Sequence, residues 1–214
     1  MILSDRDIRA RLRTGELAIE PLSDEALQIQ PASVDLRLGR EFLVYRPAQV
    51  TVLDPGDPAG IAASMDRVII EPELAFVLHP GEFALGTTIE RVKMPSDLVG
   101  MVDGRSSIGR LAVVVHATAG FIDPGFTGHI TLELSNVANL PITIYPEMKI
   151  GQLSFVQMSE PAETPYGSGA LGSKYQGQRG PGTSTRAHPT RMVFQPVPTS
   201  ARRTVARSSS RGRS

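Results

Sequence analysis

The 214-residue sequence predicts a mainly β protein. Short apolar segments recur between residues 34 and 157, and Pro, Gly or Asp-Pro separates most of them. Many short strands at such spacing are typical of an antiparallel sandwich, barrel or jelly roll. Strands do not alternate with helices and no G-x-G-x-x-G motif is present, so a nucleotide site of the Rossmann type is not expected.

One short helix is expected ahead of the strands, at about residues 5–14. Ser4 and Asp7 stand three residues apart, as the two members of a capping box do. Ile8 and Leu12 are four residues apart and therefore share one face of a helix. Gly15 follows at the position where a helix commonly ends.

The strands are expected to follow this helix within a β domain of residues 1–163. From Val34 to Leu38, apolar and polar side chains alternate with a period of two, and Gly39 ends the run. The candidate strands are 34–38, 41–45, 67–70, 75–78, 83–85, 99–102, 111–115, 129–134, 142–144 and 152–157.

The composition excludes several kinds of chemistry. The chain has no cysteine, so disulfides, thiolate nucleophiles and zinc sites with Cys ligands are ruled out. Its four histidines are scattered, without the i, i+4 spacing of a zinc-binding helix. No apolar run approaches the roughly 20 residues that span a bilayer, and the N-terminus does not read as a signal peptide. We therefore expect a cytoplasmic protein that does not contact membranes.

The formal net charge of zero is unevenly distributed. Residues 187–214 hold six of the 22 basic residues and no acid, which leaves 16 basic against 22 acidic residues in 1–186. An acidic body argues against nucleic-acid binding by the folded part. The Arg/Ser-rich tail 187–214 is expected to be a disordered, solvated extension. RNA or membrane contact by its arginines is the alternative.

The segment 104–110, Gly-Arg-Ser-Ser-Ile-Gly-Arg, is a candidate anion cradle. Glycines allow close backbone approach, hydroxyls donate hydrogen bonds, and guanidinium groups bind phosphate oxygens in a fork. A polar turn between two strands is an equally good interpretation of the composition alone.

Two carboxylates and two histidines could also carry chemistry. Asp123 precedes a Pro-Gly turn and could face a pocket, although Asp-Pro-Gly is also ordinary turn chemistry. Glu133 falls opposite Leu132 and Leu134 in a strand; partial burial would suit it for acid–base work, whereas a solvent-facing Glu is the plainer interpretation. His129 is expected on the Glu133 face, and both His129 and His116 are interpreted as structural.

Taken in order, five segments resemble the dCTP deaminase family of the dUTPase-like superfamily, most closely its bifunctional dUMP-forming members. They are 30–39, 104–110, 116–136, 149–153 and 172–181. The resemblance implies a distorted jelly-roll or β-barrel subunit, a homotrimer with active sites between subunits, and deamination of dCTP without zinc. It also implies that residues 164–186 form a Gly-rich lid over the nucleotide.

The resemblance implies roles for individual residues. Glu133 matches the proton donor and acceptor, Ser106 and the backbone of Ala119 would hold the attacking water, and Arg110 would stabilise charge beside them. The remaining substrate contacts would come from Arg105, Ser106, Ser107, Ile108, Gly109, Arg110, Asp123, Thr131, Leu132, Gln152, Tyr166, Lys174 and Gln178. Mg²⁺ is expected on the triphosphate, held largely by phosphate oxygens and water.

The pair Gly120 and Phe121 bears on the product. Small Gly120 could leave room for a second water, which Asp123 would orient against the α-phosphate. This favours release of dUMP, for thymidylate synthesis, over release of dUTP. The alternatives are a deaminase that stops at dUTP, a plain dUTPase, and a non-catalytic nucleotide-binding trimer; dTTP is a candidate regulator.

Overall fold

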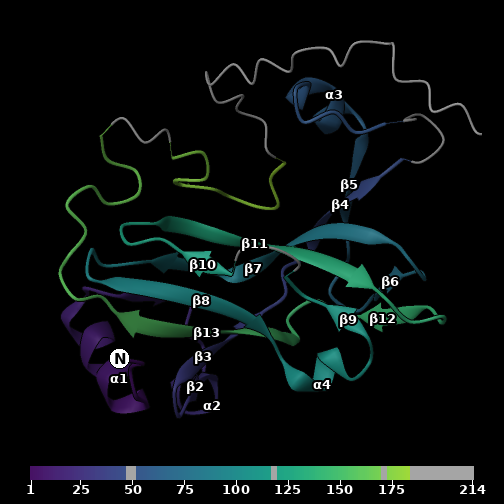
Figure 1. Cartoon of the computed structure of the whole chain (residues 1–214). Helices are drawn as coiled ribbons and strands as arrows, with labels where there is room; N and C mark the ends of the chain where they lie inside the picture. The colour runs from purple at the N-terminus through teal and green to yellow at the C-terminus, as the bar shows by residue number, and fades with distance from the viewer. Residues whose placement is uncertain (47–51, 117–119, 170–172, 184–214) are drawn as a thin grey trace, which may run out of the picture.

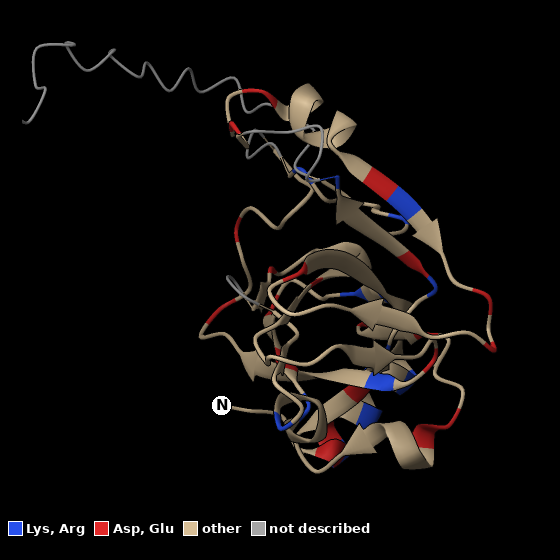
Figure 2. Ribbon diagram, turned by 90° about the vertical axis from the view of Figure 1, so that its right-hand side faces the viewer, with Lys and Arg blue, Asp and Glu red and all other residues tan. Residues whose placement is uncertain are grey.

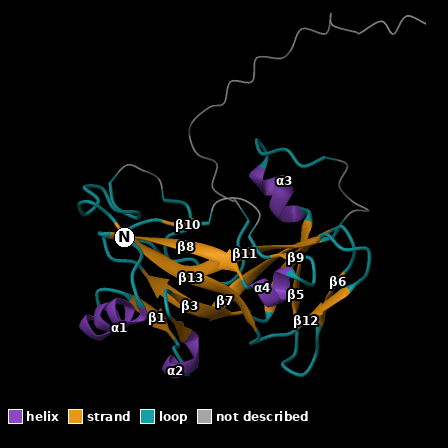
Figure 3. Ribbon diagram, turned by 60° about the horizontal axis from the view of Figure 1, so that its bottom comes forward, coloured by secondary structure: helices purple, strands orange, loops and turns teal. Residues whose placement is uncertain are grey.

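The computed structural model describes residues 1–46, 52–116, 120–169 and 173–183, and within these ranges the chain is mainly β, as predicted (Figure 1). The helices lie at the periphery and the strands form the body (Figure 3). The elements are α1 (Asp5–Thr14), β1 (Ala18–Glu20), α2 (Glu25–Gln28), β2 (Ile29–Gln30), β3 (Ser33–Arg37), β4 (Glu41–Tyr45), α3 (Pro58–Ala63), β5 (Met65–Ile69), β6 (Phe76–Leu78), β7 (Phe83–Lys93), β8 (Leu98–Gly104), α4 (Ser106–Gly109), β9 (Val113–Val114), β10 (Phe121–Ile122), β11 (Thr127–Asn136), β12 (Ile142–Ile144) and β13 (Lys149–Gln157).

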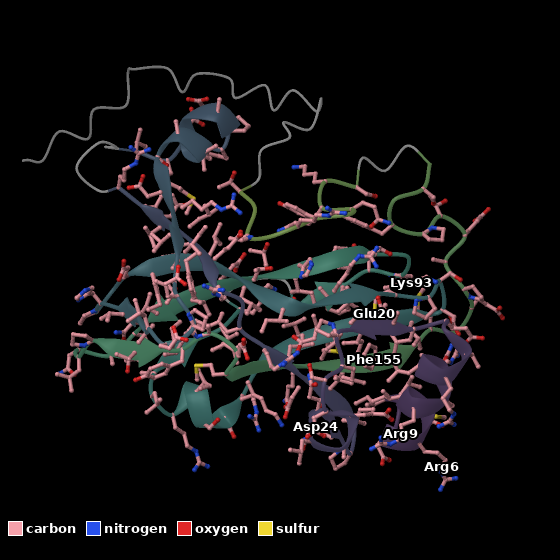
Figure 4. All side chains as sticks on the ribbon, turned by 180° about the vertical axis from the view of Figure 1, so that it is seen from behind. Arg6, Arg9, Glu20, Asp24, Lys93 and Phe155 are labelled. Atoms are coloured by element: carbon pink, nitrogen blue, oxygen red, sulfur yellow. The ribbon has the colours of Figure 1, made fainter. Side chains whose placement is uncertain are left out.

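Two large antiparallel sheets enclose the core. One has the order β5-β4-β7-β11-β9, with β1 also paired to β7, and the other has the order β10-β8-β13-β3-β2. Strand β11 alternates buried and half-buried residues along its whole length, so Leu132 and Leu134 face inward. Phe155 of β13 is fully buried in the same apolar cluster (Figure 4). The chain is therefore a distorted jelly roll of two antiparallel sheets, as predicted.

The predicted N-terminal helix is confirmed as α1. Ser4 and Asp7 form the capping box, and Gly15 ends the helix with a left-handed φ of 72°. The helix buries Ile8, while Arg6 and Arg9 lie on its outer side (Figure 4). Capping and one buried apolar stripe account for this helix at this place.

Most of the predicted strands differ from the observed ones by one to three residues at an end, and two differ in kind. The strand expected over 111–115 is paired only at Val113–Val114, because Ala112 takes a left-handed φ of 63° in the turn after α4. The strand expected over 83–85 continues to Lys93. Its later part is polar in sequence, yet Thr87, Thr88 and Glu90 are buried with hydrogen-bond partners of their own. The short strands β1, β2 and β10 and the helices α2 to α4 were not predicted.

An arm formed by β4, α3 and β5 extends from the first sheet (Figure 1). Its strands pair antiparallel from Glu41 opposite Ile69 to Tyr45 opposite Met65. Arg67 pairs with Glu41, and Arg46 lies 3.1 Å from Asp66, so charges of both signs alternate along it (Figure 2). The arm places Tyr45 and α3 beside the pocket described below.

A partly buried ion pair attaches α1 to the second sheet and makes stability pH-dependent. Arg11 lies 2.7 Å from Asp97, which also accepts a hydrogen bond from Gln157. Burial alone would raise the pKa of Asp97, but the bonds from Gln157 and Arg11 outweigh it and hold that pKa below 3.8. Because the folded-state pKa is depressed, this stabilisation is present above the unfolded-state value and is lost as pH falls through the folded-state value.

Asp97→Asn should therefore lower the free energy of unfolding at pH 7 by about 1.5–3 kcal/mol, the magnitude for a hydrogen bond to a charged group. The deficit should shrink as the pH falls below 3.8 towards the depressed pKa of the folded state, because the wild-type protein loses the same stabilisation there. Urea unfolding of both proteins at pH 7 and at a series of lower pH values measures it. A deficit that stays constant over the series would contradict the assignment.

Candidate functional site

A cavity of about 840 Å³ opens between β11, the arm and the residues that follow β13. This volume lies in the range of sites for small-molecule ligands. Its walls come from β11, from the segment around Asp123, from Tyr45 and Ile61 of the arm, and from Tyr166 and residues 173–183. Figure 1 shows this last segment running above β10 and β11.

Strand β11 presents His129, Thr131 and Glu133 to the cavity, as their period of two predicted. The register of pairing between β11 and β7 shifts between His129 and Thr131, and the extra residues lie in β7. The side chains of β11 therefore keep their alternation across the shift. The side chain of Leu132, another predicted substrate contact, is fully buried in the core, so only its backbone is left to contact a ligand.

The histidine on this face has a defined tautomer. His129 Nδ1 lies 3.1 Å from the carbonyl oxygen of Thr88, which can only accept, so a neutral imidazole carries its proton on Nδ1. Its Nε2 is then an acceptor. Both His129 and His116 line the cavity.

Asp123 reaches the cavity from the turn that follows β10. The Phe126 N–H donates to the Asp123 carbonyl over 3.1 Å, and Gly125 has φ of 87°. A Cβ at Gly125 would lie 2.7 Å from Pro165, so only glycine lets the chain after β13 pack here. The Tyr166 N–H also donates to the Pro124 carbonyl over 2.7 Å. The Asp-Pro-Gly sequence thus shapes the turn and also places a carboxylate in the pocket.

The described residues 173–183 of the predicted lid pack against β11 and line the cavity. The Gly177 N–H donates to Thr127 over 2.7 Å, the His129 N–H donates to Gln178 over 3.0 Å, and the Gln178 side-chain amide donates to the Thr131 hydroxyl. Lys174, a predicted triphosphate contact, also lines the cavity. Tyr166 accepts a hydrogen bond from the Tyr175 N–H, and burial raises the pKa of its hydroxyl. Tyr166 therefore stays a neutral donor at pH 7.

The candidate anion cradle, residues 104–110, lies outside the cavity. It forms the end of β8 and the short helix α4, with Ile108 buried as an anchor and Ser106, Ser107 and Arg110 exposed. Neither this segment nor Gln152 lines the cavity, and α4 lies at the opposite edge of the molecule from the lid (Figure 1). One subunit thus brings together only part of the predicted site.

The product-determining pair is partly explained by packing. A Cβ on Gly120 would lie 2.8 Å from the Val102 carbonyl, and the Val102 N–H donates to the Gly120 carbonyl over 2.7 Å. Gly120 is therefore needed for close approach to β8, and room for a second water stays a prediction. Phe121 lines the cavity with an exposed ring. Ala119 and the tail 187–214 lie outside the described residues.

Sequence reasoning missed the apolar wall of the pocket. Tyr45, Ile61, Phe83 and Leu85 line it, but nothing local distinguishes them from core residues. Over the part of the chain that the structure describes, no three His, Asp or Glu side chains gather as metal ligands. Within the same residues, no helix is long and apolar enough to cross a membrane.

The fold and the site together define a class of protein, that of the dUTPase-like β proteins. The crystal structure of 2'-deoxycytidine 5'-triphosphate deaminase from Agrobacterium tumefaciens superposes with a TM-score of 0.57 at 27% identity. The match covers 72% of this chain and 47% of that one, so this chain spans about half of its length.

A family model described as dCTP deaminase-like matches residues 2–158. The chain therefore belongs to the dCTP deaminase-like family, and the resemblance inferred from the motifs is confirmed. A protein of Halobacterium salinarum named dCTP deaminase, dUMP-forming, is 57% identical over 86% of this chain and 94% of its own length. One of Mycolicibacterium smegmatis with the same name is 56% identical over 88% and 97%. A relative in Natronomonas pharaonis, named dCTP deaminase, is 57% identical over 86% and 94%.

Proposed function

We propose that this protein converts dCTP and water to dUMP, ammonia and pyrophosphate. The observation that carries the proposal is one pocket holding two carboxylates, Glu133 and Asp123, on separate elements. Two hydrolytic steps each need a water to be oriented and deprotonated, and two carboxylates can divide that work. The dUMP-forming relatives, which match this chain almost end to end, support the same reaction.

Glu133 performs the acid–base chemistry of deamination. It takes one proton from the water whose oxygen bonds to C4 of cytosine and passes it to N3; it then takes the second proton from the new C4 hydroxyl and delivers it to the amino group. The C4–N bond then breaks and ammonia leaves. Ser106 and the Ala119 backbone hold the water, and Arg110 stabilises the charge that develops beside it.

Asp123 performs the second step. It contacts the sugar and orients another water against the α-phosphorus, where a new P–O bond forms as the α–β bridge breaks and pyrophosphate leaves. Lys174, Tyr166 and Gln178 contact the phosphate chain from the lid, which excludes bulk water. The substrate is the Mg²⁺ complex of dCTP, with the ion held by phosphate oxygens and water.

The active site is completed between subunits of a homotrimer. Residues 105–110 and Gln152 lie outside the pocket of their own chain, yet the chemistry needs the hydroxyl and guanidinium groups of that segment beside Glu133. A neighbouring subunit supplies them if its α4 meets this pocket. Leu111, Val137 and Leu140 near α4 and β11 are large, exposed apolar side chains that such contact would cover.

Asp123→Asn tests the product. The purified protein with Mg²⁺ and dCTP should yield dUMP and pyrophosphate, whereas the variant should deaminate at a comparable rate and accumulate dUTP. Chromatography of the nucleotides over time measures both. Wild-type accumulation of dUTP would establish the enzyme that stops after deamination, and unchanged dCTP with folded protein would favour the non-catalytic alternative.

A further inference from the structure

A buried carboxylate lies beneath the candidate anion cradle. Asp35 of β3 is only 1% exposed. Its Oδ1 lies 3.4 Å from Arg105 Nε, and its Oδ2 lies 3.1 Å from Lys149 Nζ. A buried carboxylate is costly without partners of opposite charge, and these two cations are the partners that the structure provides.

A second buried carboxylate of the same fold behaves differently. Glu90 is fully buried and accepts hydrogen bonds from the Arg37 backbone, the Arg37 guanidinium and Gln28, so both its oxygens are satisfied internally. Among the described residues, Asp35 Oδ2 accepts no aligned hydrogen bond despite its nearby lysine. The carboxylate of Glu90 is therefore held by an ion pair and by hydrogen bonds to both oxygens, whereas Asp35 is held mainly by the charges of Arg105 and Lys149.

The partners of Asp35 face outward. The side chains of Arg105 and Lys149 are 33% and 30% exposed, so each contacts buried Asp35 on one side and solvent on the other. Arg105 is also anchored by its backbone N–H, which donates to Ile150, and Lys149 donates to the Leu27 carbonyl. Gln152, a predicted triphosphate contact, pairs directly opposite Asp35 in the sheet. Because two cations share one carboxylate, the group of Asp35, Arg105 and Lys149 has a net positive charge.

We propose that Asp35 is a positioning residue that acts through Arg105. By holding the guanidinium in one orientation at the end of β8, it prepares Arg105 to bind a phosphate group of the nucleotide and removes the rotamer freedom that binding would otherwise have to restrict. Lys149 shares the carboxylate and adds a second positive charge beside it. The proposal rests on the proposed function, in which Arg105 contacts the triphosphate.

Steady-state kinetics with Mg²⁺ and dCTP, and inhibition by tripolyphosphate, test the assignment in wild type, Asp35→Asn and the matched control Glu90→Gln. Asp35→Asn should raise KM and the tripolyphosphate inhibition constant together by about tenfold, the effect of weakening one charge-assisted hydrogen bond, with kcat within about twofold. Glu90→Gln should lower the melting temperature and leave KM unchanged. In an Arg105→Met background, Asp35→Asn should raise KM no further, since it acts through the missing side chain.

Three outcomes would overturn the proposal: an unchanged KM in Asp35→Asn, an equal rise in both variants, or an additive effect with Arg105→Met. If Asp35→Asn does not fold, Asp35→Glu replaces it, with Glu90→Asp as control. Moving the carboxylate displaces the guanidinium, so KM should rise only for Asp35→Glu.

Failure of the proposed function would appear separately, as wild-type protein that leaves dCTP unchanged. Calorimetric titration with tripolyphosphate then decides the role of Asp35 alone. Binding about tenfold weaker in Asp35→Asn than in wild type supports it. Equal binding, or no binding to wild type, overturns it.

Discussion

Glu133→Gln should lower kcat for dCTP deamination by about 10²- to 10⁴-fold, the usual contribution of a positioned general acid–base group. The change removes the carboxylate that exchanges protons with the water and the base, and it keeps nearly the same volume. Because Glu133 is on the half-buried pocket face of β11, with Leu132 and Leu134 opposite, the core should be undisturbed.

Steady-state kinetics give kcat, and single-turnover measurement of ammonia release gives the rate constant of the chemical step without product release. Glu160→Gln, the same change at an exposed residue outside the pocket, serves as control and should match wild type. Tripolyphosphate affinity should also be unchanged in Glu133→Gln. A folded variant that keeps more than about a tenth of wild-type kcat would remove Glu133 from the acid–base role.

Mixing two inactive variants should restore activity if the site is shared between subunits. Glu133→Gln damages the pocket and Arg110→Met damages the α4 segment, which does not line the pocket of its own chain. In trimers assembled at random from equal amounts, about one site in four combines an intact pocket with an intact α4 from a neighbour. The mixture should therefore reach about a quarter of wild-type activity.

Co-refolding followed by size determination and kinetics measures this recovery. Glu133→Gln mixed with Lys174→Met is the control, because both changes fall in one pocket and no mixed site is intact. That mixture should show no more activity than its separate components. Mixed assemblies of Glu133→Gln and Arg110→Met that stay inactive would contradict a site completed by a neighbouring subunit.

Features that depend on neighbours in the sequence were predicted well. The capping box from Ser4 to Asp7 and the stop at Gly15 are present as expected, and the strand at 41–45 was placed to the residue. The alternation along β11 correctly placed Thr131 and Glu133 on one face. The polar second half of β7 was missed because its buried threonines and Glu90 are satisfied by partners far away in the chain.

The candidate site also has some features that depend on neighbours in the sequence and others that depend on distant partners. The sequence by itself determined the fold class, and its turn and strand patterns made Asp123 and Glu133 pocket candidates, since turns and periodicity arise from local hydrogen bonding and side-chain alternation. Lys174 was implied only by the resemblance to the family. Only the tertiary structure decided that α4 lies away from this pocket, that the arm supplies Tyr45, and that Asp35 lies buried beneath Arg105. Those placements follow from packing between segments up to about a hundred residues apart in the chain, and burial of a polar group there is set by distant partners, which no local pattern records.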